Sequence, residues 1–263
     1  MFGSYLTKAT VPGSKRWLPL DIDWSRRLNL TFLSRDCTPI GSVLFAMSAI
    51  VQSIQVGEIR SYTDPTGKTW QSAIEKVTVD GPVEVRQSGM TGDQQADLVH
   101  HGGVDKAVHG YSCDHFADWQ KEFPEWSVKA GCWGENLTIQ GQTERDVCIG
   151  DVFQIGTCRL QVSQPREPCW KLARINNLDK LPVRVQQLGR TGWYFRVFQP
   201  GAIQAGDAIE LVERADHGMT LERANQIMFA KPRNPADDLA LANCPELSDA
   251  WREGLERRAS GKT

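Results

Sequence analysis

Residues 152–162 carry the pattern that decides the fold: VFQI and CRLQV, two short apolar runs separated by Gly156-Thr157. A two-residue connection between such runs is typical of a β-hairpin. Similar short runs recur along the chain between Gly, Pro and Asp turns, among them Asp80-Gly81-Pro82. We predict strands over residues 49–59, 73–79, 83–87, 136–139, 152–155, 158–162, 194–199 and 208–212. Many short strands at this spacing favour a barrel over a doubly wound parallel sheet.

Helical patterns interrupt and follow these strands. Apolar residues recur at helical spacing in 113–123 and in 178–188, where Pro182 falls in the first turn. Near the C-terminus, Thr220, Asn234 and Ser248 are each residues of the kind that caps a helix start. The sequence therefore predicts a mainly β (α+β) fold in which a few helices interrupt a barrel and three helices follow it.

Three parts of the chain differ in character. Residues 1–46 show neither a strand nor a helix period, so we expect an N-terminal extension that is poorly ordered or dispensable. Residues 47–215 form the predicted barrel domain, and residues 216–263 form the three-helix domain. Three helices alone bury too little surface to be stable, so they are expected to pack on the barrel. The alternative is that Leu247, Trp251 and Leu255 form a docking face for an electron donor or a second subunit.

Composition excludes several classes of protein. The chain has 263 residues, 40% hydrophobic and 24% charged, which excludes a collagen-like or largely disordered chain. A net charge of −2 gives no electrostatic reason to expect nucleic acid or an anionic membrane as a partner. No run of apolar residues is long enough to span a membrane, and residues 1–29 lack the apolar region of a secretory signal. Seven cysteines without CxxC pairing favour free thiols and a cytoplasmic location.

The densest cluster of reactive residues is HGGVDKAVHGY, residues 101–111, with Asp93 shortly before it. Adjacent Gly102 and Gly103 allow the backbone to approach an anion closely, and Lys106 adds a positive charge. His101 is a candidate hydrogen-bond donor or proton acceptor. The alternative is a tight loop whose histidines only satisfy backbone groups. The histidines and carboxylates lack the spacing of known zinc sites, so zinc is not predicted.

A second cluster is VSQPREPCWKL, residues 162–172. Two prolines stiffen the loop on either side of Arg166, and Cys169 lies between Arg166 and Lys171. Neighbouring positive charge favours a thiolate, the form of cysteine that binds a soft metal or attacks an electrophile. Cys148 and Cys158 lie in apolar strands and are predicted to fill the core.

Two further motifs, GENLT (134–138) and IGDVF (149–153), place polar residues beside strands. Such residues often lie at the mouth of a barrel, although in isolation ordinary turn formation is the preferred interpretation of these motifs. In this order the four motifs resemble the MOSC family, named for the C-terminal domain of molybdenum-cofactor sulfurases, and in particular its stand-alone YiiM-type members. The resemblance spans about residues 50–213, and the tail resembles the helical domain that follows the barrel in that group. Residues 1–46 have no counterpart in it.

The resemblance implies a β-barrel that binds molybdenum–molybdopterin (Mo), with Cys169 as the metal ligand. Molybdopterin carries a phosphate, for which basic and glycine-rich residues are suitable partners. The implied cofactor contacts are His101, Gly102, Gly103, Lys106, Asn136, Arg166, Cys169 and Lys171. Trp170 is expected to narrow access to the metal. His109-Gly110 is expected to make the loop before Tyr111 flexible.

The resemblance also implies an enzyme that reduces N-hydroxylated compounds, such as hydroxylaminopurines, amidoximes and hydroxamates. Cys169 acts as a ligand rather than a nucleophile, and His101 or Asp93 relays protons. Because no G-x-G-x-x-G loop opens a helix, a separate flavin or iron–sulfur reductase is expected to supply electrons. The expected partners are therefore a small N-hydroxylated substrate and this electron donor, and neither nucleic acid nor a membrane. The sequence is also compatible with a homodimer. Two alternatives remain: a carrier that binds the cofactor without turnover, and sulfur transfer through a Cys169 persulfide.

Overall fold

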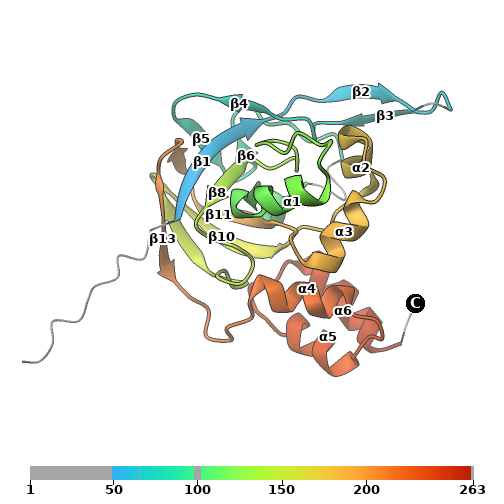
Figure 1. Cartoon of the computed structure of the whole chain (residues 1–263). Coiled ribbons are helices and arrows are strands. Elements are labelled where there is room, and N and C mark those ends of the chain that lie inside the picture. Colours follow the sequence, from blue (N-terminus) through green and yellow to red (C-terminus); the bar gives the residue numbers. More distant parts are fainter. Residues whose placement is uncertain (1–48, 65, 98–101, 262–263) are drawn as a thin grey trace, which may run out of the picture. The chain divides into compact units, whose positions relative to one another are not determined.

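The structure is a computed structural model that describes residues 49–64, 66–97 and 102–261. The expected extension, residues 1–46, lies outside the described residues. The described residues form one compact unit. All the elements described below belong to that unit (Figure 1).

Seven strands close into the predicted barrel (Figure 1). They are β1 (Ala49–Val56), β7 (Val108–Ser112), β8 (Leu137–Gln140), β9 (Val152–Ile155), β10 (Cys158–Pro165), β11 (Trp193–Gln199) and β13 (Ala208–Glu213). Their order around the ring is β1-β13-β9-β10-β11-β7-β8, and β8 pairs with β1 to close it. All neighbours are antiparallel except β7 and β8. The predicted hairpin at Gly156-Thr157 is confirmed, since Cys158 pairs with Ile155 across it.

Six shorter strands flank the barrel. β4 (Val77–Val79) pairs with β1, while β2 (Arg60–Thr63) and β3 (Thr69–Ser72) form a separate hairpin. A three-stranded sheet contains β5 (Val83–Arg86), β6 (Gly89–Met90) and β12 (Gly201–Ile203). The strands predicted over 49–59 and 73–79 are shorter than expected. The chain turns at Gly57, where a Cβ atom would lie only 2.3 Å from the carbonyl oxygen of Ala73.

The segment 108–112 corrects one expectation. The sequence suggested a flexible loop around His109-Gly110, whereas the structure places both residues in β7, every residue of which is buried. A Cβ atom on Gly110 would lie 2.9 Å from Cδ1 of Ile139 and 3.0 Å from Cε2 of Phe195. Glycine is therefore required here because it leaves room for those side chains inside the barrel.

Short helices connect the strands. They are the 3₁₀ turns η1 (Val104–Lys106) and η2 (Cys113–His115) and the helices α1 (Phe116–Glu122), α2 (Trp170–Asn176) and α3 (Leu181–Leu188). The helical patterns predicted over 113–123 and 178–188 are confirmed, and α2 was not predicted. Trp119 of α1 packs with Tyr111 and Trp133 in a second, largely aromatic core cluster.

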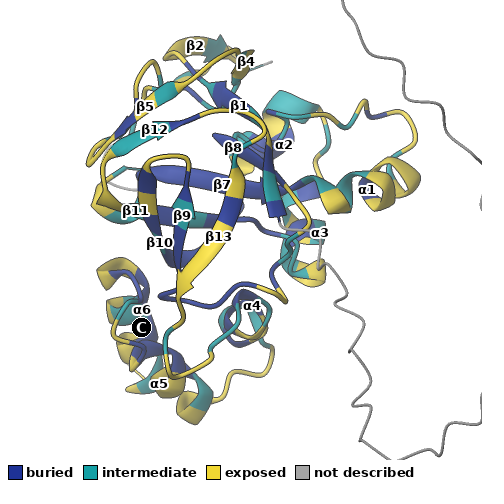
Figure 2. Ribbon diagram, turned by 90° about the vertical axis from the view of Figure 1, so that its left-hand side faces the viewer, coloured by how far each residue is buried: buried dark blue, intermediate teal, exposed yellow. Residues whose placement is uncertain are grey.

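Three helices complete the chain: α4 (Leu221–Phe229), α5 (Pro235–Ala242) and α6 (Asp249–Ala259). The predicted caps are confirmed, because the side chains of Thr220, Asn234 and Ser248 each accept a hydrogen bond from the first turn. Apolar residues of these helices belong to the same core cluster as the barrel interior (Figure 2). Leu247, Trp251 and Leu255 are at most 4% exposed, so they pack in this core and do not form a docking face.

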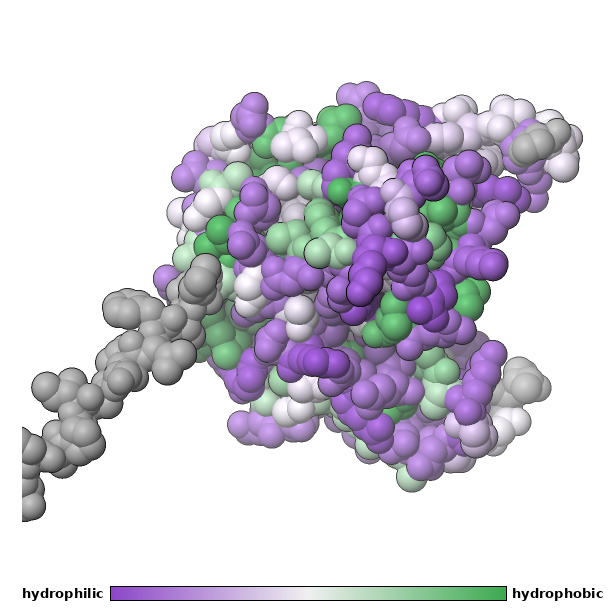
Figure 3. Space-filling view, viewed as in Figure 1, coloured by the Kyte–Doolittle hydropathy of each residue, from purple (hydrophilic) through white to green (hydrophobic). Residues whose placement is uncertain are grey.

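No helix in the described part of the chain has the length and apolar character needed to cross a bilayer. The face seen in Figure 3 is covered mostly by hydrophilic residues, and its hydrophobic residues lie in small separate groups. Scattered apolar residues of this kind are ordinary on protein surfaces.

Candidate active site

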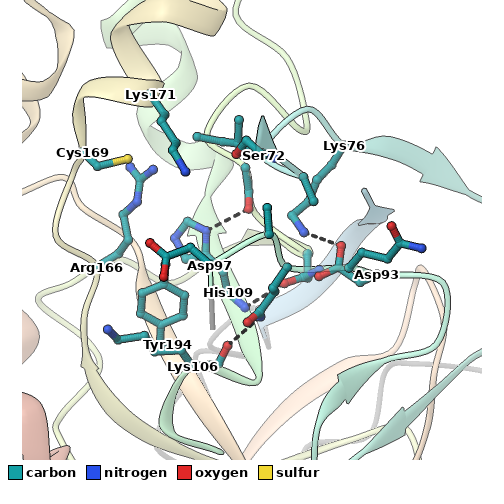
Figure 4. Close-up of a pocket in the computed structure, with 17 residues that line it drawn as sticks. Ser72, Lys76, Asp93, Asp97, Lys106, His109, Arg166, Cys169, Lys171 and Tyr194 are labelled. Atoms are coloured by element: carbon teal, nitrogen blue, oxygen red, sulfur yellow. Dashed lines mark hydrogen bonds and ion pairs between the residues drawn. The ribbon is translucent and has the colours of Figure 1, made fainter. Parts of the chain in front are cut away.

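One cavity collects most of the reactive residues that the sequence singled out (Figure 4). Its wall is formed by the segment after β3, residues 93–97, the end of η1, β7, and the loop between β10 and α2. It encloses about 640 Å³ of empty space when its open mouth is included. Four cations line it: Lys76, Lys106, Arg166 and Lys171.

Cys169 lies in this wall at the residue that precedes α2. Its backbone is extended (φ −104°, ψ 166°), and its carbonyl accepts a hydrogen bond from the N–H of Leu172. The thiol is free and half-buried, and Cys169 is the one cysteine among the described residues that lines the cavity. Cys148 and Cys158 are buried as predicted, and burial raises the pKa of the Cys158 thiol to about 11. Cys169 is therefore the cysteine placed to meet a ligand.

Arg166 and Lys171 make the same part of the cavity positive. The Arg166 side chain is buried, and its Nη1 has no hydrogen-bond partner among the described residues. Lys171 Nζ donates to the carbonyl of Gln71 at 3.2 Å. Neither cation forms an ion pair with a carboxylate in the part of the chain that the structure describes. In Figure 4 the guanidinium of Arg166 and the thiol of Cys169 extend toward the same region of the cavity. A buried guanidinium without a carboxylate favours binding of an anion.

Asp93 and Lys76 form a buried ion pair at the opposite wall (Figure 4). Oδ1 of Asp93 also accepts a 2.7 Å hydrogen bond from the N–H of Gly57. Burial lowers the pKa of Lys76, and the charge of Asp93 opposes that effect. Both contacts of the carboxylate fall on Oδ1, so Oδ2 has no hydrogen-bond partner among the described residues. Lys76 was not predicted as a site residue, because the sequence placed it inside a strand.

His109 also lines the cavity and was missed as a site residue. Its Nδ1 lies 3.3 Å from the carbonyl oxygen of Gly134, whereas Nε2 is buried without a hydrogen-bond partner among the described residues. Burial, with a further effect from the charge of Arg166, lowers the pKa of His109 well below 6.5. The folded protein therefore holds this imidazole neutral. His109 belongs to the motif 101–111, but the alternation of polar and apolar residues that would have marked 108–112 as a strand is absent, so its position in the cavity wall was not predicted.

Asn136 lines the cavity, but its amide is already engaged. Oδ1 accepts a 3.0 Å hydrogen bond from the N–H of His109, and Nδ2 donates to the carbonyl of Gln55 at 3.3 Å. These bonds join the start of β8 to β7 and β1. The side chain therefore stabilises the barrel wall, and since Nδ2 carries a second N–H, the predicted contact of Asn136 with a pterin stays a prediction.

The glycine-rich segment only partly enters the site. Lys106 lines the cavity, and burial lowers its pKa. Gly102 and Gly103 do not line the cavity. At Gly103, with φ 97°, the chain turns into η1, and its carbonyl accepts a hydrogen bond from the N–H of Lys106. The predicted anion contact of the two glycines stays a prediction, and His101 lies outside the described residues.

The other two motifs form turns. The buried carboxylate of Glu135 accepts hydrogen bonds from the N–H groups of Gly131 and Trp133, and burial raises its pKa. Asp151 accepts from the N–H of Cys148 and pairs with Arg214. Turn formation accounts for IGDVF, whereas Gly134 and Asn136 of GENLT also line the cavity. The described residues contain no group of three His, Cys, Asp or Glu side chains able to hold a metal ion.

Comparisons with known proteins match both halves of the compact unit. The MOSC domain model matches residues 97–210, and the YiiM-like three-helix domain model matches residues 219–261. YflK of Bacillus subtilis is 38% identical over 192 residues, 73% of this chain and 86% of that protein. YiiM of Escherichia coli is 37% identical over 212 residues, 80% of this chain and 92% of that protein. A protein of Gibberella moniliformis named a reductase is 35% identical over 201 residues, 75% of this chain but only 35% of its own length.

Solved structures agree with these sequence matches. The crystal structure of YiiM from Geobacillus stearothermophilus has a TM-score of 0.68 at 36% identity and covers 80% of this chain and 99% of that one. YiiM from Escherichia coli has a TM-score of 0.63 at 32% identity, with 80% and 94% covered. MOSC domains are associated with molybdenum-cofactor binding. The chain therefore belongs to the MOSC-domain family, in the YiiM-like group that carries a three-helix domain after the barrel.

Proposed function

We propose that this protein is a molybdenum-cofactor-dependent reductase of N-hydroxylated compounds, with Cys169 as the protein ligand of the metal. One observation carries the proposal: the free Cys169 thiol lies in an open cavity beside Arg166 and Lys171, cations without a carboxylate partner among the described residues. A soft thiolate suits a soft metal centre, and such cations suit the phosphate of a pterin cofactor.

The residues in the cavity fit such a cofactor. The orphaned, buried Nη1 of Arg166 is an unsatisfied donor, which a phosphate oxygen would pair. Lys171 lies on the same loop and helix start as Cys169, so one rigid segment presents both the thiol and a cation. Lys106 adds a further cation from η1. We infer that these four side chains hold the cofactor, with Cys169 on the metal and the cations around the phosphate.

The reaction breaks the N–O bond of the substrate, forms an N–H bond and releases the oxygen as water, consuming two electrons and two protons. When bound, the molybdenum cofactor supplies the two-electron centre at which the N–O bond is cleaved. Asp93 is the proposed proton carrier, because Oδ2 is left open while Lys76 and Gly57 fix Oδ1. The match to a third of a longer protein named a reductase supports redox chemistry. A separate flavin or iron–sulfur protein is proposed as the electron donor.

Turnover with a chemical reductant tests the proposal. Protein made in a strain that synthesises the cofactor is supplied with reduced viologen and benzhydroxamate, and formation of benzamide is measured. We expect turnover by the wild-type protein and a loss of about a hundredfold or more for Cys169→Ala. Cys132→Ala is the matched control, because Cys132 is also free and half-buried but does not line the cavity.

Two results would contradict the proposal. Metal-loaded protein that never reduces benzhydroxamate would indicate a cofactor carrier. Cyanide-releasable sulfur on Cys169, with sulfur transfer in the absence of molybdenum, would indicate a persulfide enzyme.

A further inference from the structure

Three aromatic side chains meet beside the cavity and form a ledge, which we define as Tyr62, Trp70 and Trp170. The rings of Tyr62 and Trp70 stack with centroids 4.2 Å apart and planes at 15°. The ring of Trp170 meets Trp70 edge-on at 5.0 Å and 68°. Tyr62 and Trp70 face each other across the β2–β3 hairpin, and Trp170 is the first residue of α2. In Figure 1 the hairpin runs alongside α2.

The ledge is not part of the protein core. Neither hydrophobic core cluster contains Tyr62, Trp70 or Trp170, and Trp170 is 53% exposed. Large aromatic side chains left accessible together are unusual unless they bind something, because each buries a large area when it packs. Trp170 therefore offers its exposed ring to a ligand without any change in the fold, while Tyr62 and Trp70 are half-buried and stack on each other.

Three connections join the ledge to the cavity. Trp170 directly follows Cys169, so their Cα atoms are about 3.8 Å apart. Lys171 lines the cavity, and its Nζ lies 6.0 Å from the ring centroid of Trp70. Ser72, at the end of β3, lines the cavity two residues after Trp70. The ledge therefore lies next to the part of the cavity wall that carries Cys169 and Lys171.

We propose that the ledge binds the flat, conjugated ring of the substrate, so that its N–OH group points into the cavity toward Cys169. The ligand class is a planar aromatic or heteroaromatic compound with an N-hydroxylated substituent, as opposed to an aliphatic one. A ring in offset-stacked or edge-to-face contact with Trp170 gains the attraction common to aromatic pairs. The identity of the ligand rests on the proposed function, whereas the ring contact does not.

The test compares a substrate that has a ring with one that lacks it. For loaded protein, kcat/KM is measured with benzhydroxamate and with acetohydroxamate, which share the reacting group. We expect Trp170→Leu to lower the ratio of kcat/KM for benzhydroxamate to kcat/KM for acetohydroxamate about five- to tenfold. Trp170→Phe should retain most of the wild-type ratio, because it keeps an aromatic ring. Phe198→Leu is the matched control, since Phe198 is 59% exposed on β11 and does not line the cavity.

A binding measurement separates this inference from the proposed reaction. The affinity of loaded protein for benzamide, which needs no turnover, is measured by calorimetry for the same variants and for Trp70→Leu. We expect Trp170→Leu and Trp70→Leu to raise the Kd about five- to tenfold, with melting curves that match the wild type. If benzamide binding depends on Trp170 but benzhydroxamate is never reduced, the ledge stands and the proposed function fails. If reduction proceeds with an unchanged ratio and an unchanged Kd in Trp170→Leu, the ledge is refuted and the reductase stands.

Discussion

The hydroxyl of Ser248 donates a 2.7 Å hydrogen bond to Oε1 of Gln164, and the N–H of Ser248 donates to the carbonyl of Ser163 at 3.1 Å. Ser248 begins α6, and Gln164 lies on β10 just before the Cys169 loop. Ser163 and Gln164 are both fully buried. The three-helix region thus holds the strand that delivers Cys169 to the cavity, which gives that region a role in positioning the site.

Ser248→Ala removes this connection and the cap of α6 together. Because the Oε1 atom of Gln164 is left buried without its donor, we expect the free energy of unfolding to fall by about 1–3 kcal/mol. Urea denaturation measures the change. Ser260→Ala, at the exposed end of the same helix, serves as the control and should alter stability by less than about 0.5 kcal/mol. Equal changes in the free energy of unfolding for the two substitutions would show that the Ser248 contact does not stabilise the fold more than an exposed hydroxyl does.

Arg166→Gln tests the anion site. Since Arg166 Nη1 is buried without a partner among the described residues, we expect the variant to bind inorganic phosphate about ten- to a hundredfold more weakly and to retain less pterin. Calorimetry and fluorescence of the oxidised pterin measure the two effects. Arg174→Gln changes an exposed cation of α2 that does not line the cavity, so it should behave as the wild type. An Arg166→Gln protein with unaltered phosphate binding would place the anion elsewhere.

Thiol alkylation ranks the cysteines by access. Burial raises the pKa of both Cys158 and Cys244 to about 11, so at pH 8 their thiolate fractions are very small. Cys169 is half-buried in an open cavity. We expect iodoacetamide to modify Cys169 at least about tenfold faster than Cys158 or Cys244 in the folded protein, as followed by peptide mass spectrometry. Comparable rates at the three cysteines would contradict the assigned burial.

His109 predicts a pH dependence of stability. Its pKa in the folded protein lies well below 6.5, mainly through burial, whereas the unfolded chain titrates near 6.5. As the pH falls below 6.5 the unfolded state binds a proton that the folded state does not, so stability decreases. The contribution of His109 has a slope of at most about 1.4 kcal/mol per pH unit.

Urea unfolding between pH 7 and pH 5 measures that slope. We expect His109→Gln to reduce it relative to the wild type, because the substitution removes the imidazole that only the unfolded chain protonates. A His109→Gln protein with the wild-type slope would mean that this imidazole is charged in the folded state.

Local sequence patterns predicted the barrel, but they did not predict strand β7. Runs such as 152–162 alternate or cluster apolar residues and are separated by turn residues, so both strands and their hairpin were predictable. In β7 the sequence VHGYS looks like a loop because glycine and histidine are rare in strands. Gly110 is there because Ile139 and Phe195 occupy the space of its side chain, which only the tertiary structure reveals.

The site residues also divide into those that a sequence motif identifies and those that only the fold places in the cavity. Cys169, Arg166 and Lys171 stand close together in the sequence, so a single motif is enough to identify them. Lys76 reaches the cavity from a segment that no motif marks, and His109 lies in the motif 101–111 without a signal that its side chain lines the cavity. Asn136 lies in the cavity wall as its motif suggested, while only the fold reveals that its amide also joins strands.

Molybdenum content is the most direct test of the central claim that Cys169 binds the metal of the cofactor. Wild-type protein, Cys169→Ala and Cys132→Ala are purified from a strain that synthesises the cofactor, and metal per chain is determined by mass spectrometry. We predict close to one molybdenum per chain for the wild type and for Cys132→Ala, and about a tenth of that or less for Cys169→Ala. Full molybdenum occupancy in Cys169→Ala, or none in the wild type, would contradict the account.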